Sequence, residues 1–403
     1  MKRLGVHISL LCVALSGMVA CGSAGAGGVV HVGGLIPLTG GGAVYGPDIE
    51  TALRIAVDEI NADPPMGRRL QLHVQDSQTD PDAATRAAQK LISVNRVSAI
   101  LGMWSSAETL AVAPLAIQSG KVLMTAAGAG DITRLDDKGL VWRFYPPGKY
   151  TGDAIARAVR EQGWRTAVAM SRNDPSGLTI IGSFKTAFEK LGGRVVDSVT
   201  YPPNQSSYTG EVRRAIGERA DVIVNVGYTP ELAAMMKDAQ NSAEKGTWLS
   251  VGWSVNQGLL DAVGNQAVEG LYSVDAAPNV KSAAYGHLRK AFQDETGSPL
   301  LASDTFAFSA YDSAVVVGLA IQACECTEGD ALTTAIAQVT TAPGKKVDSY
   351  ADGVAALRDG GEIDYQGASS DLEFDNKGDQ LTGYGVYRVQ AGRVELLKEF
   401  TLS

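Results

Sequence analysis

Short runs of β-branched and other apolar residues alternate with longer amphipathic runs from Val29 onward. This alternation is typical of βαβ units built around a parallel sheet. The first series predicts strands at Val29–Pro37, Leu70–Asp76, Ala99–Leu101 and Val122–Thr125, with helices near Ile49–Asn61, Pro81–Val94 and Ala107–Gln118 between them. We therefore expect a first parallel sheet that carries its helices between successive strands.

A second series of the same kind begins after the helix-breaking cluster Pro146-Pro147-Gly148, which fits a crossover between two domains. Its strands are expected at Thr166–Ser171, Val195–Tyr201, Val222–Val226 and Trp248–Val251, and its helices at Asp153–Gln162, Ile180–Leu191, Glu211–Arg219 and Glu231–Ser242. The pattern predicts an α/β fold with two doubly wound parallel-sheet domains.

The order changes after Gly270–Val274, where two long helical patterns, Ala283–Thr296 and Thr305–Cys324, follow without a clear strand between them. We expect this part of the chain to return to the first domain. Alternating runs then predict C-terminal strands in the second domain, at Asp371–Phe374, Tyr384–Val389 and Val394–Phe400.

The first residues have the pattern of an export signal. Met1-Lys2-Arg3 precedes an apolar run from Leu4 to Ala20, and such a segment is removed and does not belong to the fold. Val19-Ala20-Cys21 resembles the lipoprotein signal, in which cleavage at residue 21 leaves Cys21 as a lipid-bearing N-terminus.

The residues around this cleavage site allow a second interpretation. An ordinary signal peptide cut near Ala24 or Ala26 would leave Cys21 without a role. If Cys21 carries lipid, the stretch Gly22–Gly28 has the small-residue composition of a flexible leash to the membrane surface.

Length and charge narrow the function. A chain of 403 residues suggests two or three domains, and two is the number that the strand pattern supports. The formal net charge is -9, and the 35 Lys and Arg residues form no basic tract longer than a pair such as Arg68-Arg69. Nucleic acid is therefore not an expected partner, because it is bound by concentrated positive charge.

The cysteines and histidines predict neither a metal site nor a cofactor. Beyond the signal only Cys324 and Cys326 remain, one residue apart, and His31, His73 and His287 all lie far from them in sequence. A metal site needs more ligands than this pair supplies. An exported protein permits a disulfide, but so small a ring would be strained, so their oxidation state stays open.

Enzyme motifs are missing from the sequence. The chain contains no Gly-x-Ser-x-Gly elbow, no His-Glu-x-x-His and no phosphate-binding Gly-x-x-x-x-Gly-Lys. The aspartates at 76, 80 and 82 are better explained as a solvated turn, and Asp375–Asp379 lacks the glycine placement of a calcium loop. The sequence therefore indicates a binding protein and not an enzyme.

Candidate binding residues follow the strands, because open parallel sheets bind ligands beyond the carboxyl ends of their strands. After Ala99–Leu101, Trp104 offers a flat apolar face, and Ser105, Ser106 and the amides of the following helix could hold a carboxylate. Ser105 with Glu108 also matches a capping box, which needs no ligand. Capping and binding are compatible.

Two further loops have the same position. Ala126–Asp131, which includes Ala127, Gly128 and Ala129, lacks bulk and would let a ligand approach the backbone. In Gly227–Glu231, Thr229 is a plausible N-cap. Tyr228 either lines the strand end or packs on the helix.

Several segments, in their order and spacing, resemble the leucine/isoleucine/valine-binding type of solute-binding protein from ABC importers. They are Ile36–Gly40, Tyr45-Gly46, Ala56–Asn61, Asp76–Pro81, Gly102–Ser106, Gly227–Glu231, Tyr365–Ala368 and Phe374–Asp379. The resemblance spans nearly the whole mature chain.

The resemblance implies a type I periplasmic-binding-protein fold, with two α/β lobes joined by three crossovers that close on a small solute. It implies an N-terminal lobe at 29–147 and 278–366 and a C-terminal lobe at 148–277 and 367–403. Carried over by position, the pocket would be lined by Tyr45, by Ser105 or Ser106, by the backbone at Ala127–Ala129, and by Tyr228.

The chain departs from the amino-acid-binding relatives at three places. The loop Gly252-Trp253-Ser254-Val255 lacks the acid that pairs with a ligand ammonium, Ala129 replaces a hydroxyl residue, and Asn173–Gly177 lacks an aromatic residue. A buried ammonium needs a counter-ion, so either another acid such as Asp131 supplies it or the solute lacks that charge. Trp104 and Trp253 would suit an aromatic or amide-bearing solute, and Ser254, next to Trp253, is also a candidate ligand-binding residue.

The resulting hypothesis is an extracytoplasmic solute-binding lipoprotein of an ABC importer. Its partners would be a small organic solute (an amino acid, an amide or an aromatic or organic carboxylate), the permease and ATPase subunits, and the membrane through lipid on Cys21. The alternatives are a ligand-sensing receptor of the same fold and an exported hydrolase.

Overall fold

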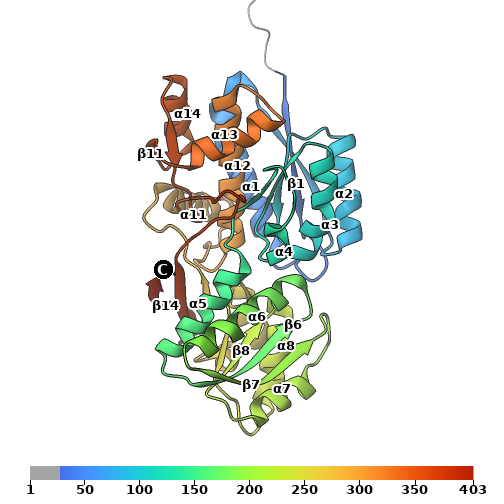
Figure 1. Cartoon of the computed structure of the whole chain (residues 1–403), viewed down its shortest axis with the longest axis vertical. Helices are drawn as coiled ribbons and strands as arrows, with labels where there is room; N and C mark the ends of the chain where they lie inside the picture. Colours follow the sequence, from blue (N-terminus) through green and yellow to red (C-terminus); the bar gives the residue numbers. More distant parts are fainter. Residues whose placement is uncertain (1–27, 403) are drawn as a thin grey trace, which may run out of the picture.

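The computed structural model of the protein describes residues 28–402 and shows two α/β lobes stacked along the long axis (Figure 1). The predicted signal at 1–21, with its proposed lipidation site Cys21, and all of the predicted leash except Gly28 lie outside the described residues. Each lobe is built around one main sheet. The prediction of an α/β fold with two largely parallel sheets is confirmed.

The upper lobe in Figure 1 contains a five-stranded parallel sheet with the order β2-β1-β3-β4-β5. Its strands are β1 (Val30–Ile36), β2 (Leu70–Asp76), β3 (Ala99–Met103), β4 (Val122–Thr125) and β5 (Val141–Arg143). The helical segments between them are α1 (Gly46–Ala62), η1 (Pro65–Gly67), α2 (Pro81–Ser93), α3 (Ser106–Gln118) and α4 (Gly130–Thr133). The central strands β3 and β4 are buried along their whole length, which explains their continuous apolar sequence.

The lower lobe contains a seven-stranded sheet with the order β14-β13-β10-β9-β8-β6-β7. Its strands are β6 (Thr166–Arg172), β7 (Arg194–Tyr201), β8 (Val222–Val226), β9 (Trp248–Val251), β10 (Tyr272–Ala276), β13 (Tyr384–Gln390) and β14 (Arg393–Phe400). Its helical segments are α5 (Gly148–Glu161), α6 (Pro175–Lys190), α7 (Thr209–Gly217), α8 (Thr229–Gln240), η2 (Gly252–Ser254), α9 (Gln257–Val263) and α10 (Asn265–Val268). Strands β6 to β10 are parallel, and β13 and β14 add an antiparallel edge.

After β10 the chain returns to the upper lobe. The returning elements are α11 (Ala283–Thr296), α12 (Thr305–Cys324), α13 (Asp330–Thr340), β11 (Lys345–Val347), α14 (Tyr350–Arg358) and β12 (Ile363–Tyr365). Helix α12 packs against α1 and β3. It is long and apolar enough to cross a membrane by composition, but nearly all of it is buried in the protein core.

The predicted strand at Asp371–Phe374 is wrong. Leu372 has a left-handed φ of 56°, which breaks an extended chain, and only Phe374 forms an isolated bridge. The turn that follows lies against β5 of the upper lobe, where the Arg143 amide donates to the Gly378 carbonyl over 2.8 Å. Buried Arg143 also forms an ion pair with Asp379 at 2.9 Å. The third crossover therefore reaches the lower sheet only at β13, and not at residue 367.

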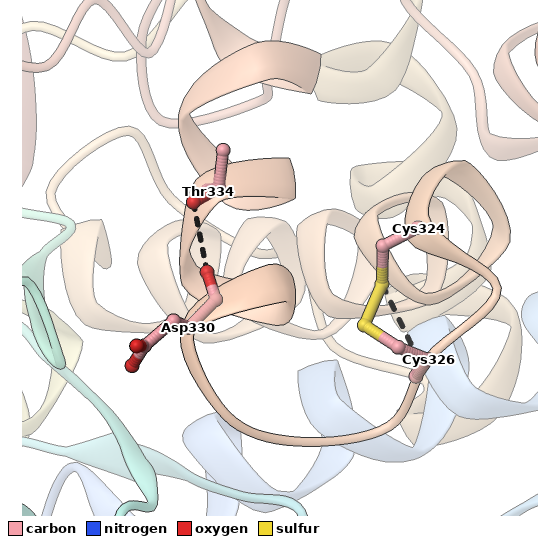
Figure 2. Close-up of a disulfide and its surroundings, with 4 residues drawn as sticks. All are labelled: Cys324, Cys326, Asp330 and Thr334. Carbon is pink, nitrogen blue, oxygen red and sulfur yellow. Dashed lines mark hydrogen bonds between the residues drawn. A yellow bond between two sulfur atoms is a disulfide. The ribbon is translucent and has the colours of Figure 1, made fainter.

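Cys324 and Cys326, which the sequence left open, form a disulfide at the end of α12 (Figure 2). The pair lies ahead of α13, whose first turn includes Asp330 and Thr334. The bond joins the end of α12 to the segment before α13, and both cysteines pack against the hydrophobic core.

Candidate functional site

Six aromatic side chains from both lobes meet between the two main sheets, and we call them the interlobe cluster. They are Tyr45, Trp104, Tyr145 and Phe306 around the upper lobe, and Tyr228 and Trp253 from the lower lobe. Each is at most 8% exposed. All of them follow the end of a strand or begin a helix, which is where open parallel sheets bind ligands.

Trp104 is the centre of this cluster. Its ring centroid lies 5.0 Å from that of Tyr45 in its own lobe and 4.7 Å from that of Tyr228 in the other lobe. Phe306, at the start of α12, lies 6.0 Å from both Trp104 and Trp253. Aromatic pairs at such distances contribute about 0.5–1.5 kcal/mol each beyond the area they bury. These tilted and edge-on ring contacts therefore help to hold the lobes together.

A hydrogen-bonded group crosses the same interface. The Tyr45 hydroxyl lies 3.1 Å from Thr229 Oγ1 and accepts from the Thr229 amide over 3.3 Å. Asn256 Nδ2 donates to Thr229 Oγ1 over 3.1 Å. Burial raises the pKa of Tyr45 well above its ordinary value, so the phenol stays protonated and able to hydrogen-bond.

The two serines expected to hold a carboxylate lie at the start of α3. Ser105 Oγ accepts from the Glu108 amide over 3.4 Å, as an N-cap does. Ser106 Oγ accepts from the Ala129 amide over 3.0 Å and so joins two of the predicted loops. Glu108 is buried, and burial raises its pKa to about 7. Its bond back to the Ser105 amide is not found in the described part of the chain, so only half of the capping box forms.

The small loop after β4 lies where the upper lobe meets α5. The Gly128 carbonyl accepts from the Gly148 amide over 2.7 Å, and a Cβ at residue 128 would lie 3.2 Å from Ser176 Oγ. The Ala127 amide donates to Thr125 Oγ1 over 3.1 Å. The small residues of this loop therefore allow its backbone to lie close to α5 and α6 of the lower lobe.

The loop after β9 brings only one of its two predicted residues to the interlobe cluster. Trp253 lies there, with its ring centroid 5.7 Å from that of Tyr145 and its indole Nε1 donating to the Gly227 carbonyl over 3.0 Å. The Ser254 hydroxyl is instead turned into its own lobe, where it donates to the Val251 carbonyl over 2.7 Å and lies 2.8 Å from Ser250 Oγ.

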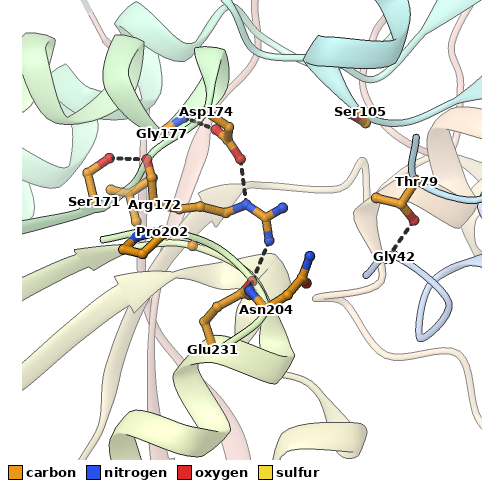
Figure 3. Close-up of polar contacts among 12 residues, drawn as sticks. Gly42, Thr79, Ser105, Ser171, Arg172, Asp174, Gly177, Pro202, Asn204 and Glu231 are labelled. Atoms are coloured by element: carbon orange, nitrogen blue, oxygen red, sulfur yellow. Dashed lines mark hydrogen bonds and ion pairs between the residues drawn. The ribbon is translucent and has the colours of Figure 1, made fainter. Parts of the chain in front are cut away.

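Arg172 is a charged residue at this interface that the sequence analysis missed. Figure 3 shows it reaching from the end of β6 to Asp174 and Glu231, with Ser105 and Thr79 of the other lobe on the facing side. Its Nε lies 2.9 Å from Asp174 Oδ2, and it forms an ion pair with Glu231. Its guanidinium lies 4.4 Å from the centre of the Tyr228 ring, so this ring stacks between Arg172 and Trp104.

Asp275, at the end of β10, connects two of the crossovers. Its Oδ1 accepts from the Tyr145 hydroxyl over 2.6 Å and from the Ala276 amide over 2.8 Å. Its Oδ2 is buried and has no hydrogen-bond partner within residues 28–402. Burial raises the pKa of Asp275 to about 7. Tyr145 lies next to the first crossover and Ala276 lies next to the second. The Asp275 carboxyl group therefore links the two crossovers by hydrogen bonds.

Asp131, considered from the sequence as a substitute for the missing acid, lies at the surface and outside the interlobe cluster. It is exposed and pairs with Arg134 one turn further along the chain. A charge held by a neighbouring arginine at the surface offers little to a buried ligand.

A cavity of about 290 Å³ adjoins the interlobe cluster. Its walls come from the start of α1, the loop 298–304, the start of α12 and, from the lower lobe, the start of α9. Tyr45 and Phe306 belong to both the cavity and the interlobe cluster. The volume suits a solute of the size of an amino acid, near the small end of ligand pockets at about 300 Å³.

Three residues of this interface, Arg172, Tyr145 and Phe306, were not predicted from the sequence. They differ in whether the sequence marks them as unusual. Arg172 ends a buried strand with a charge, and Tyr145 directly precedes Pro146-Pro147, so both were visible as unusual positions. Nothing in the sequence distinguishes Phe306, because it is one of many apolar residues in α12 and is distant in sequence from most of the interlobe cluster.

Two lobes with parallel sheets, joined by several crossovers and meeting at loops that follow strands, define a two-lobed α/β binding protein. Residues 29–360 match the periplasmic binding protein family, and the chain belongs to that family. It is therefore a binding protein and not an enzyme.

Known relatives agree with this assignment. The Leu/Ile/Val-binding protein homolog 7 of Brucella abortus (strain 2308) is 26% identical over 283 residues, which cover 67% of this chain and 69% of the relative. A leucine binding protein, LivK from Thermotoga maritima, has the same fold with a TM-score of 0.80 at 22% identity, covering 93% of this chain and 99% of the other. A solute binding protein from Rhodopseudomonas palustris BisB5, in complex with 3,4-dihydroxybenzoic acid, has a TM-score of 0.76 at 20% identity, covering 93% and 97%.

Replacing Tyr45 by Phe removes the hydroxyl that bonds across the lobes and keeps the ring. A hydrogen bond contributes about 1 kcal/mol, so the Thr229 amide should exchange its hydrogen about fivefold faster in Tyr45→Phe. Hydrogen–deuterium exchange measured by mass spectrometry checks this. Tyr272→Phe, at the amino end of β10, is the control and should leave the Thr229 amide unchanged. Equal exchange in wild type and Tyr45→Phe would contradict the interlobe bond.

Replacing Asp275 by Asn should change how stability depends on pH. The pKa of Asp275 is about 7 in the folded protein and near 4 when unfolded, so the folded state gains a proton that the unfolded state lacks between these values. The wild type should thus lose stability from pH 4 to pH 7, by roughly 4 kcal/mol from this group, and the loss should be smaller in Asp275→Asn. Urea unfolding at pH 5 and pH 8 gives the free energy of unfolding of the wild type and of Asp275→Asn. If the free energy of unfolding changes equally between pH 5 and pH 8 in both proteins, Asp275 does not titrate in this range.

Proposed function

We propose that the protein is the extracytoplasmic solute-binding component of an ABC importer, closing its two lobes on a small polar organic solute. The observation that carries the proposal is the meeting of Trp104, Tyr228 and Trp253 between the lobes. These residues come from loops that are far apart in sequence, and all of these loops lie beyond the carboxyl ends of strands. The names of the relatives, which include leucine-binding and benzoate-type solute-binding proteins, support the same function.

The proposed site uses all the residues that the sequence singled out except Ser254, whose hydroxyl is bonded within its own lobe. They are Tyr45, Trp104, Ser105, Ser106, Ala127, Gly128, Ala129, Tyr228 and Trp253. The flat faces of Trp104 and Trp253 would cover the apolar part of the solute. The start of α3, with Ser105 and Ser106, would receive a carboxylate through its free amides. The solute is thus an amino acid, an amide, or an aromatic or organic carboxylate.

The lobes are proposed to move as two bodies. The first consists of 29–147 and 278–366 together with the turn at 374–380 that lies on β5, and the second of 148–277 and the strands β13 and β14. Three segments link them, at 144–147, 277–282 and 381–383. Because the links lie side by side next to the tie between Tyr145 and Asp275, small backbone rotations there could open the space between the lobes.

Cys21 is proposed to carry lipid, with residues 22–28 as the leash that leaves the two lobes free to reach the permease and ATPase subunits of the transporter. The support is the order of basic residues, apolar run and Val19-Ala20-Cys21. One lipid-bearing residue places the protein at the outer side of the membrane that it is exported across.

Replacing Trp104 by Ala should weaken solute binding, because it removes the ring that contacts both Tyr45 and Tyr228. Buried aromatic anchors contribute about 2 kcal/mol, so the dissociation constant should rise about thirtyfold. Calorimetry would use whichever solute is found by mass spectrometry of protein purified without denaturation. Trp164→Ala is the matched control, since Trp164 packs on Tyr272 at the amino end of the lower sheet. An equal loss of solute affinity in Trp104→Ala and Trp164→Ala would contradict the proposed role of Trp104 in the binding site.

Replacing Cys21 by Ala should release the protein from the membrane. The variant should move from the membrane fraction to the soluble fraction after export, and metabolic labelling with a fatty-acid analogue should disappear with it. Cys324→Ala provides the control and should keep both label and membrane fraction, because Cys324 lies in the folded upper lobe. A soluble wild type without label would rule out the anchor.

A further inference from the structure

The charged residues that line the cavity beside the interlobe cluster are all acidic. Asp48 and Asp304 lie on its wall, at the beginnings of α1 and α12, and no Lys, Arg or His is among its lining residues in the described chain. Neither carboxylate forms an ion pair anywhere in residues 28–402. Asp304 Oδ2 accepts from the Leu301 amide over 2.6 Å, which is its one bond to the loop before α12.

The cation Arg289 only partly offsets the charge of this wall, because burial raises the pKa of Asp304 by more than Arg289 lowers it. Arg289 lies on α11 and lines the neighbouring cavity, where its Nε donates to the Leu300 carbonyl over 2.8 Å. Burial raises the pKa of Asp304 to about 7, and Asp48 adds to this rise through its negative charge. Asp304 in turn contributes to the raised pKa of Asp275. Three carboxyl groups thus influence one another around one side of the interlobe cluster.

A buried hydroxyl without a partner marks the same cavity. Ser303 is 5% exposed, lines the cavity, and its Oγ has no hydrogen-bond partner in the part of the chain that the structure describes. Buried polar groups are nearly always hydrogen-bonded, so an unpartnered one next to a cavity indicates that a ligand supplies the bond. The rings of Tyr45 and Phe306 complete the wall, and aromatic faces attract cations.

The lower lobe closes this cavity. Asn256, Gln257 and Gly258, at the start of α9, lie on its wall, and a Cβ at Gly258 would come within 3.1 Å of Val44. Asn256 also donates to Thr229, the residue bonded to Tyr45. The cavity is therefore formed only when the lobes are together, as a solute site should be.

We propose that this cavity binds the ammonium group of the solute, with Asp48 and Asp304 as its counter-ions. The inference rests on the proposed solute-binding function and narrows it to amine-bearing solutes. The acid that is absent from the loop after β9 is then replaced by two carboxylates of the upper lobe. From this cavity the remainder of the solute would extend past Phe306 toward Trp104 and Trp253, whose ring centroids lie 6.0 Å from that of Phe306.

The test compares probes that differ only in charged groups. One set is leucine, 4-methylpentanoate and 3-methylbutylamine; the other is phenylalanine, 3-phenylpropanoate and 2-phenylethylamine, with benzoate added. Calorimetry is run on the mature wild type and on the variants Asp304→Asn and Asp48→Asn. Asparagine removes the charge at nearly the same volume, and neither aspartate makes a side-chain capping bond among the described residues, so the first turns of α1 and α12 should persist. Asp330→Asn, in the exposed first turn of α13, is the matched control.

We expect amine-bearing probes to bind the wild type, with each cavity substitution weakening them about tenfold or more and the control leaving affinity within about twofold. Circular dichroism on the same samples shows whether each variant folds, and two independent variants guard against the failure of one. Binding of amine-free carboxylates alone, with unchanged affinity in both cavity variants, would overturn this inference and leave the proposed function standing. Binding of no probe, together with no retained solute in natively purified protein, would overturn both.

Discussion

The packing of Trp104 between a ring of its own lobe and a ring of the other is the contact on which the arrangement of the protein depends. Trp104 follows a buried strand, so its backbone is fixed by the upper sheet, and its indole reaches across to Tyr228. Tyr228 is itself held from behind by Arg172. A row of four side chains, Arg172, Tyr228, Trp104 and Tyr45, thus runs from the lower lobe to the upper lobe, and the separation of the lobes requires this row to break.

Much of the fold could be predicted because the central strands of each main sheet are buried on both sides. Buried parallel strands read as continuous apolar runs, and the central strands were found for this reason. The limits of α11 and α12 were also found, because long helical patterns have clear ends. Strands of three residues, such as β5 and β12, carry too few positions to show a period. The false strand at Asp371–Phe374 had a proper alternation, and only the left-handed backbone at Leu372 prevented it from forming.

The site was predictable in part, and for a physical reason. Strand ends of one parallel sheet share an edge, so loops that follow strands must gather, and Trp104, Tyr228 and Trp253 did so. Side-chain direction was not predictable, as the inward turn of the Ser254 hydroxyl shows. Nor could the sequence place Asp304 next to Asp48, since these residues are brought together only by the return of the chain after β10. Asp131, by contrast, could be considered from the sequence because it follows a strand, and in the structure it pairs with Arg134 at the surface.

The central claim is that two lobes close on a small solute, and small-angle X-ray scattering tests it most directly. The protein is unfolded, freed of solute by dialysis, refolded and measured with and without the solute identified in natively purified material. The account predicts a smaller radius of gyration with solute, and a solute-bound profile that matches the closed arrangement of Figure 1. Identical profiles at a solute concentration where calorimetry shows saturation would contradict it.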